Sequence, residues 1–147
     1  MCLNASHCPR RPSMQPPAED FFDLMRRRLS SEGGLIAETA LREHWRQQGR
    51  PPQDLDELLD RDQLRSITWR AQRWLPVFQF HPDGLTPRAD VAVIAGELAG
   101  GMDAAEILAW FACSNESLDG ETPITRLRKG LLAVLDAARL DRFIGSA

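Results

Sequence analysis

The chain has 147 residues, 43% of them hydrophobic and 27% charged, which is enough for one medium-sized domain or two small ones. Its formal net charge is −3 at pH 7, which excludes a basic protein that binds nucleic acid over its whole surface. Residues 1–75 carry 12 arginines and 11 acidic residues, whereas residues 76–147 carry 6 basic and 10 acidic ones. A nucleic-acid surface is therefore expected only in the first half, and the acidic second half suits a partner with a basic surface.

The first 19 residues are rich in proline, serine and arginine and lack apolar periodicity, so we expect a disordered tail. Cys2, His7 and Cys8 lie in this tail without a fourth ligand, and we expect no metal site there. No apolar stretch approaches membrane length, and the N-terminus lacks the apolar core of a signal peptide. These features predict a cytoplasmic protein that makes no contact with a membrane.

Residues 20–73 are expected to form an N-terminal helical subdomain. Apolar spacing predicts helices over residues 20–29, 35–48, 54–59 and 62–74. Gly33-Gly34 ends the first helix, and the sequence Gly49-Arg50-Pro51-Pro52 ends the second.

The last two of these helices resemble a helix-turn-helix pair with arginines that could contact DNA phosphates and base edges. Five acidic residues between positions 54 and 62 would repel a duplex, however, and no glycine marks a tight turn. DNA binding and a purely supporting role therefore both remain open for this pair. The candidate DNA-binding residues are Arg61, Arg65, Arg70 and Arg73.

Residues 74–147 are expected to form a second helical domain that begins with an extended arm around Phe78 and Phe80. Thr86 before Pro87, Asp103 before Glu106, and Thr122 before Pro123 are each typical of a helix N-terminus. We expect the third to open the longest apolar stripe, formed by Leu127, Leu131, Val134, Leu135 and Ala138. The predicted fold class is all-α, a small helical bundle.

The chain carries no recognisable catalytic motif. His7, His44 and His81 have no serine or cysteine beside them in a nucleophile motif. Gly100-Gly101 lacks the preceding strand and the following Lys-Ser/Thr of a phosphate-binding loop. We therefore expect a protein that is not an enzyme and that needs no cofactor or metal.

The second half of the chain carries a more specific pattern. It reads Trp74-x-Pro76-x-Phe78-Gln79-Phe80-x-x-Asp83-Gly84, then Pro87, Trp110-Phe111, Ser114-Asn115-x-x-Leu118-Asp119-Gly120-x-x-Pro123 and Gly130. From about residue 74 to 140, roughly half of the chain, this order resembles the C-terminal toxin-binding domain of the MbcA/ParS/Xre antitoxin family. Residues 1–73 lack the clear Xre-like DNA-reading helix of that family.

The resemblance implies a bacterial antitoxin that docks on a RES-domain toxin, an enzyme that consumes NAD or modifies a target with its ADP-ribose. The antitoxin would block the NAD pocket of the toxin and could repress its own operon by binding operator DNA. It would act as a homodimer or as a hetero-oligomer with the toxin. Candidate toxin-binding residues are Trp110, Asn115, Leu118, Pro123, Leu140, Arg142, Phe143 and Ile144.

Leu140, Phe143 and Ile144 are the apolar residues of the C-terminal end, with Arg142 among them. This end could instead fold back on the protein's own core. Two other functions also remain open from the sequence. One is a DNA-binding transcriptional regulator without a toxin partner, and the other is an orphan protein-interaction module.

Overall fold

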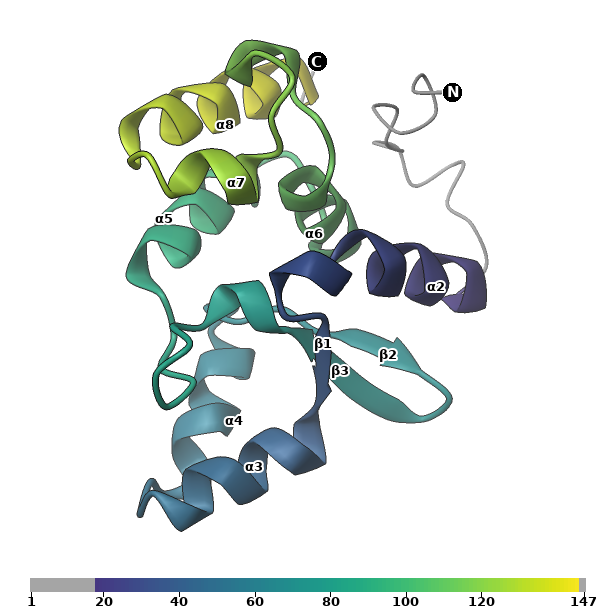
Figure 1. Ribbon diagram of the computed structural model, residues 1–147, viewed down its shortest axis with the longest axis vertical. Coiled ribbons are helices and arrows are strands. Elements are labelled where there is room, and N and C mark those ends of the chain that lie inside the picture. Colours follow the sequence, from purple (N-terminus) through teal and green to yellow (C-terminus); the bar gives the residue numbers. More distant parts are fainter. Residues whose placement is uncertain (1–17, 146–147) are drawn as a thin grey trace. The chain divides into compact units, whose positions relative to one another are not determined.

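The computed structural model describes residues 18–145, with the side chains of residues 20–142 (Figure 1). The described chain forms two compact units, an N-terminal unit of residues 18–92 and a C-terminal unit of residues 93–145. The division lies between Ala92 and Val93, whereas the sequence placed it between Arg73 and Trp74. The earlier position falls inside strand β3 (Gln72–Pro76), whose two neighbours in the sheet are both formed by residues before it.

The prediction of an all-α fold is wrong, because the N-terminal unit contains a three-stranded antiparallel sheet with the order β1-β3-β2. Strand β1 (Leu35–Ala37) pairs with β3 and places Ile36 opposite Leu75. Strand β2 (Ile67–Trp69) forms a hairpin with β3 and places Ile67 opposite Trp74. Helices still make up most of the described chain, so the fold is mixed with helices dominant.

The helix predicted over residues 62–74 is therefore a turn followed by a hairpin. The two-residue loop Arg70-Ala71 has φ of +53° and +62°, the left-handed conformation that a tight hairpin turn requires. The apolar residues that suggested helical spacing include Ile67 and Trp74, and these face each other across the two strands. An alternation of buried Ile67, exposed Thr68 and half-buried Trp69 is typical of a strand.

The other predicted helices of this unit are present with adjusted ends. They are α2 (Ala18–Arg28), α3 (Glu38–Gln47) and α4 (Pro52–Asp60), and a short 3-10 helix η2 (Ser30–Glu32) follows α2. Strand β1 takes the first three residues of the helix expected over residues 35–48. Ile36 is β-branched and favours a strand, and the backbone of residues 35–37 pairs with β3.

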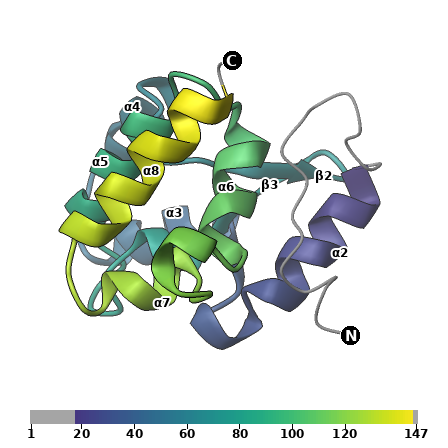
Figure 2. The same cartoon turned by 90° about the horizontal axis from the view of Figure 1, so that it is seen from above.

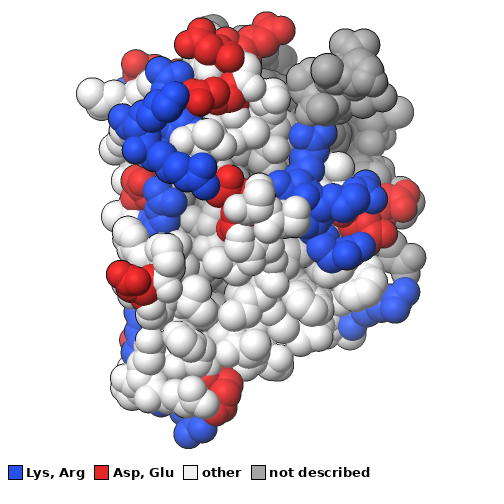
Figure 3. Space-filling model, in the orientation of Figure 1, with Lys and Arg blue, Asp and Glu red and all other residues white. Residues whose placement is uncertain are grey.

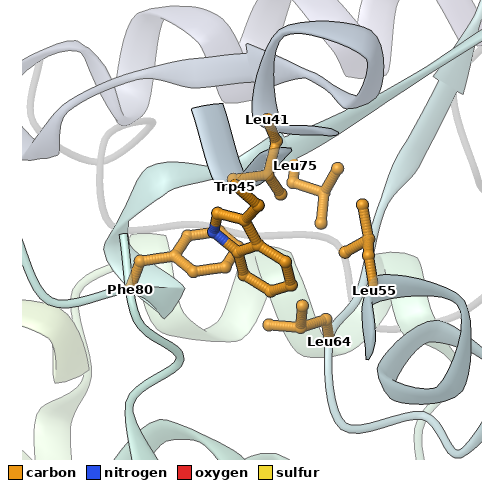
Figure 4. Packing of buried hydrophobic residues seen from close by; sticks show 6 residues of the cluster. All are labelled: Leu41, Trp45, Leu55, Leu64, Leu75 and Phe80. Atoms are coloured by element: carbon orange, nitrogen blue, oxygen red, sulfur yellow. The ribbon is translucent and has the colours of Figure 1, made fainter. Parts of the chain in front are cut away.

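The core of the N-terminal unit gathers apolar side chains from α3, α4, strand β3 and two positions outside the helices and the sheet, Leu64 and Phe80 (Figure 4). Trp45 lies at its centre, edge to face with Phe80 at 6.4 Å between ring centroids. The Trp45 indole N–H donates to the Leu85 carbonyl at 3.0 Å, so this buried donor is satisfied. The cluster consists of Leu41, Trp45, Leu55, Leu64, Leu75 and Phe80.

The segment after β3 does not lead directly into a helix. It forms a 3-10 helix η3 (Val77–Gln79), and Phe80 then pairs with Pro87 in an isolated antiparallel bridge. The expectation that Thr86 caps a helix is wrong, because α5 (Ala89–Leu98) begins three residues later. The Asp90 carboxylate accepts from the Val91 N–H at 2.8 Å at the start of this helix.

The C-terminal unit contains the end of α5 and the helices α6 (Ala104–Ala112), η4 (Glu116–Leu118), α7 (Pro123–Leu127) and α8 (Leu132–Gly145) (Figure 2). Two predicted caps are confirmed: Asp103 and Glu106 form a capping box on α6, and the Thr122 hydroxyl accepts from the Thr125 N–H at 3.2 Å. Thr122 opens the short helix α7, however, and not the longest run. A turn through Gly130, at φ +138°, separates α7 from α8.

Within the described part of the chain, no helix combines the length and the apolar character needed to cross a membrane.

Candidate partner-binding surface

Large exposed apolar side chains occur in only one of the two units. In the described chain they are Leu132 at 74% exposure, Val93 at 51% and Leu140 at 49%, and all three belong to the C-terminal unit. Leu132 opens α8, Leu140 lies two turns further along it, and Val93 lies on α5. We call these three residues the exposed apolar set.

Charged side chains of α8 form ion pairs beside this set. Glu97 on α5 accepts from Arg142 at 3.0 Å and lies 3.6 Å from Arg139. These pairs place α8 beside α5, with Val93 one turn before Glu97 on the same helix. Figure 3 shows basic side chains gathered over α7 and α8. Leu140 and Val93 therefore lie near charged side chains, as at the rim of many interfaces.

A buried polar cluster fixes the end of α8 to the loop that follows α6. The carboxylate of Asp141, itself buried, accepts from the Trp110 indole N–H at 2.6 Å and from the Asn115 amide at 3.1 Å. The other end of the Asn115 amide accepts from the Ser117 N–H at 2.9 Å. One carboxylate thus joins α6, the loop and α8, which makes the cluster a structural support.

The loop between α6 and α7 is closed by its own backbone. The Asn115 N–H donates to the Glu121 carbonyl at 3.0 Å, and the Gly120 N–H returns to the Asn115 carbonyl at 2.9 Å. Asp119 and Gly120 both have positive φ, at +57° and +83°, which reverses the chain after η4. The motif Asn-x-x-Leu-Asp-Gly is therefore explained by loop geometry, with no need for a ligand.

The structure divides the eight predicted toxin-binding residues into three groups. Four are buried and contribute to the interior of the C-terminal unit, namely Trp110, Asn115, Leu118 and Pro123. Leu140 and Arg142 are exposed on α8, with Arg142 paired to Glu97. Phe143 and Ile144 continue the same helix, but their side chains lie outside the described residues.

Two exposed residues of the surface, Val93 and Leu132, were absent from the sequence-based set. The predicted apolar stripe from Leu127 to Ala138 leaves Leu132 out, and no sequence pattern assigned a role to Val93. The signal that could have identified Leu132 is Gly130, because a glycine two residues earlier breaks the stripe and starts a new helix. No comparable signal marks Val93.

The four predicted DNA-binding arginines do not form a common surface on a helix. Arg65 is buried, and burial lowers the pKa of its guanidinium while the charge of Asp62 opposes this shift. Arg73 binds Glu38 through two hydrogen bonds of 2.5 and 3.0 Å. Arg61 pairs with Glu57 at 3.4 Å, and Arg70 stacks over Trp69 in the hairpin loop.

A charge network around Glu38 ties together three elements of the N-terminal unit. The Glu38 carboxylate on α3 accepts from Arg73 on β3 and from Arg42 at 2.8 Å, and Arg42 continues to Asp56 on α4 at 2.5 Å. Burial raises the pKa of the Glu38 carboxyl, but the two arginines outweigh it and leave the pKa below its usual value of 4.5. The Arg73 guanidinium is therefore paired with Glu38 within the N-terminal unit.

Metal ligation finds no support among the residues that the structure covers, since no group of three or more His, Cys, Asp or Glu side chains comes together there. Cys2, His7 and Cys8 lie outside the described residues. Comparison of the chain with protein-family models, with curated proteins and with solved structures finds no match.

Proposed function

We propose that this chain is the antitoxin of a type II toxin–antitoxin system, which neutralises a RES-domain, NAD-consuming toxin by direct binding and blocks its active site. The proposal places the protein in the bacterial cytoplasm, where it acts without catalysis, cofactor or metal. It rests on the resemblance of residues 74–140 to the MbcA/ParS/Xre antitoxin family.

The observation that supports a partner-binding role is the location of the exposed apolar set. A soluble domain gains about 25 cal/mol for each Å² of apolar surface that it removes from water, so leucines left at 74% and 49% exposure favour a partner that covers them. The described residues of the N-terminal unit leave no large apolar side chain exposed to this degree. We therefore assign the toxin contact to α5 and α8 of the C-terminal unit.

This assignment gives the four buried residues of the predicted toxin-binding set a supporting role instead of a direct contact. Trp110, Asn115, Leu118 and Pro123 would support the surface by fixing the loop and α8 through Asp141. The three residues of the exposed apolar set, Val93, Leu132 and Leu140, would touch the toxin.

Co-expression with a RES-domain protein encoded beside this gene tests the proposal. We expect the wild-type chain to restore growth and to co-purify with the toxin. Leu132→Glu and Leu140→Glu should each weaken binding by at least about tenfold, because each places a charge where an apolar contact is lost. Gln53→Glu is the matched control, since it adds the same charge at an exposed position of α4.

The possible results test the antitoxin function and the assigned toxin-binding surface separately. A wild-type chain that neither binds nor protects against such a toxin would refute the antitoxin function. Full protection by both leucine variants, with thermal melts like the wild type, would refute the assigned surface and leave the function standing.

A further inference from the structure

A pocket of about 270 Å³ lies between α3 and the start of α4 in the N-terminal unit. Its walls are largely apolar, with Trp45 and Leu55 at the core side and Pro51 and Pro52 at the entry to α4. A cavity of about 150 Å³ is enough to hold a benzene molecule, so this pocket has room for one ring and a short side arm.

Three arginines and Glu43 line the same pocket, and two of the arginines are already neutralised. Arg42 pairs with Glu38 and Asp56, and Arg46 pairs with Glu43 at 2.6 Å. Each of these guanidinium groups therefore has a carboxylate within the protein. They shape the rim of the pocket and leave little charge for a ligand.

The third, Arg50, has no such partner among the described residues. Its guanidinium stacks on the Trp45 ring at 3.9 Å from the centroid, and its Nη1 is buried without a hydrogen-bond acceptor. Buried donors without acceptors are rare in folded proteins, and their cost is removed when an acceptor arrives. Arg50 is thus a fixed cation beside an apolar pocket, with a donor left unsatisfied.

We infer that this pocket binds a small organic acid, with an aromatic or branched apolar body against Trp45 and Leu55 and a carboxylate that pairs with Arg50. The pocket size selects a body of about one ring. The planar guanidinium selects a carboxylate, which it can contact through two parallel hydrogen bonds. This site belongs to the N-terminal unit and does not depend on the proposed antitoxin function.

Acidic residues of the protein near Arg50 affect how strongly the pocket can bind an acid. Arg50 also borders a neighbouring hollow of about 340 Å³, whose lining includes Asp54 and Glu57. Neither carboxylate forms an ion pair with Arg50 in the described part of the chain, and both carry the same charge as the proposed ligand. Asp54→Asn removes one of these negative charges and should therefore strengthen binding of the acid.

Titration of the full chain with 3-phenylpropionate, followed by ¹H–¹⁵N NMR, tests this inference. The indole N–H signal of Trp45 and the Nε–H signal of Arg50 should shift in a saturable way at probe concentrations up to about 10 mM. The neutral analogue 3-phenylpropionamide has the same shape and should bind at least about tenfold more weakly, because it cannot form the charged pair.

Two arginine variants test whether Arg50 is the residue that pairs with the carboxylate of the acid. Arg50→Gln should reduce the affinity for the acid to that for the amide, whereas Arg61→Gln, an exposed control on the neighbouring hollow, should leave it unchanged. If Arg50→Gln fails to fold, the comparison of acid and amide on the wild-type chain still decides. Equal affinity for the two probes, absence of saturable shifts, or shifts confined to residues outside the pocket would each overturn the inference.

Discussion

Glu38 is the residue at which two ion pairs of the N-terminal unit meet. Its side chain is only 14% exposed and receives hydrogen bonds from Arg42 and Arg73. A carboxylate held this way stays ionised at a lower pH in the folded chain than in the unfolded chain. It therefore contributes stability above the unfolded pKa of about 4.5, and this stability is lost as the pH falls through the lower folded pKa.

We expect Glu38→Gln to lower the free energy of unfolding at pH 7 by about 1–2 kcal/mol, because it removes the charged acceptor of two arginines. Urea unfolding at a series of pH values measures this difference, which should shrink as the pH falls below about 4.5.

The matched control is Glu43→Gln, which removes a more exposed carboxylate paired with Arg46 on the same helix and should have a smaller effect. A difference between wild type and Glu38→Gln that stays constant with pH would show that the ion network does not stabilise the unit.

At the scale of an element, the two Thr-Pro pairs give a direct test of what makes a helix cap. The Thr122 hydroxyl accepts from the Thr125 N–H, whereas Thr86 precedes a bridge residue and no helix begins at Pro87. Thr122→Ala should therefore lower the free energy of unfolding by about 1 kcal/mol. Thr86→Ala should change it by less than about 0.5 kcal/mol, as is typical of an exposed surface position.

Chemical denaturation of both variants checks this prediction. Equal losses for Thr122→Ala and Thr86→Ala would mean that the cap on α7 contributes nothing beyond a general effect of the substitution.

The hairpin offers a second test at this scale. Ala71 has φ +62°, a conformation that costs a residue with a Cβ about 1 kcal/mol and costs glycine almost nothing. Ala71→Gly should therefore raise the free energy of unfolding, by about 0.5–1 kcal/mol. Ala40→Gly, at an exposed position of α3, should lower it by a similar amount because glycine is unfavourable in a helix.

Thermal or urea unfolding of the two glycine variants should thus give shifts of opposite sign. A destabilised Ala71→Gly chain would show that the loop between β2 and β3 does not adopt the left-handed conformation in solution.

For the whole molecule, the net charge of −3 and the local pairing of arginines both bear on DNA binding. Arg73 and Arg61 are paired with acids, Arg65 is buried, and the helix expected to carry three of the four arginines is a hairpin. We therefore expect the chain alone to bind its own upstream DNA with little affinity and little dependence on salt.

A gel-shift titration at low and moderate salt measures this expectation. A specific shift that weakens steeply with salt would contradict it. Arg61→Ala and Arg70→Ala would then identify whether the two more exposed arginines make the contact, since neither is buried.

Several parts of this protein follow from the sequence because their interactions are local. The capping box of Asp103 and Glu106 and the Thr122 cap each join residues three positions apart, so the pattern alone predicts them. The helices α2 and α4 follow from apolar spacing between clear stop signals. The contact of Asn115 is equally local, because its side-chain oxygen accepts from the Ser117 N–H two residues away.

Only the tertiary structure decided the rest, because it depends on partners far apart in the chain. Leu35–Ala37 becomes a strand because it pairs with residues 74–76, and residues 62–74 form a hairpin in spite of their helical spacing. Trp110 is buried because Asp141 offers its N–H an acceptor from α8. Leu132 and Leu140 are exposed because the face of α8 that packs inward carries Val134, Ala137 and Ala138. Burial and strand pairing sum contacts over long sequence separations, which a local pattern does not contain.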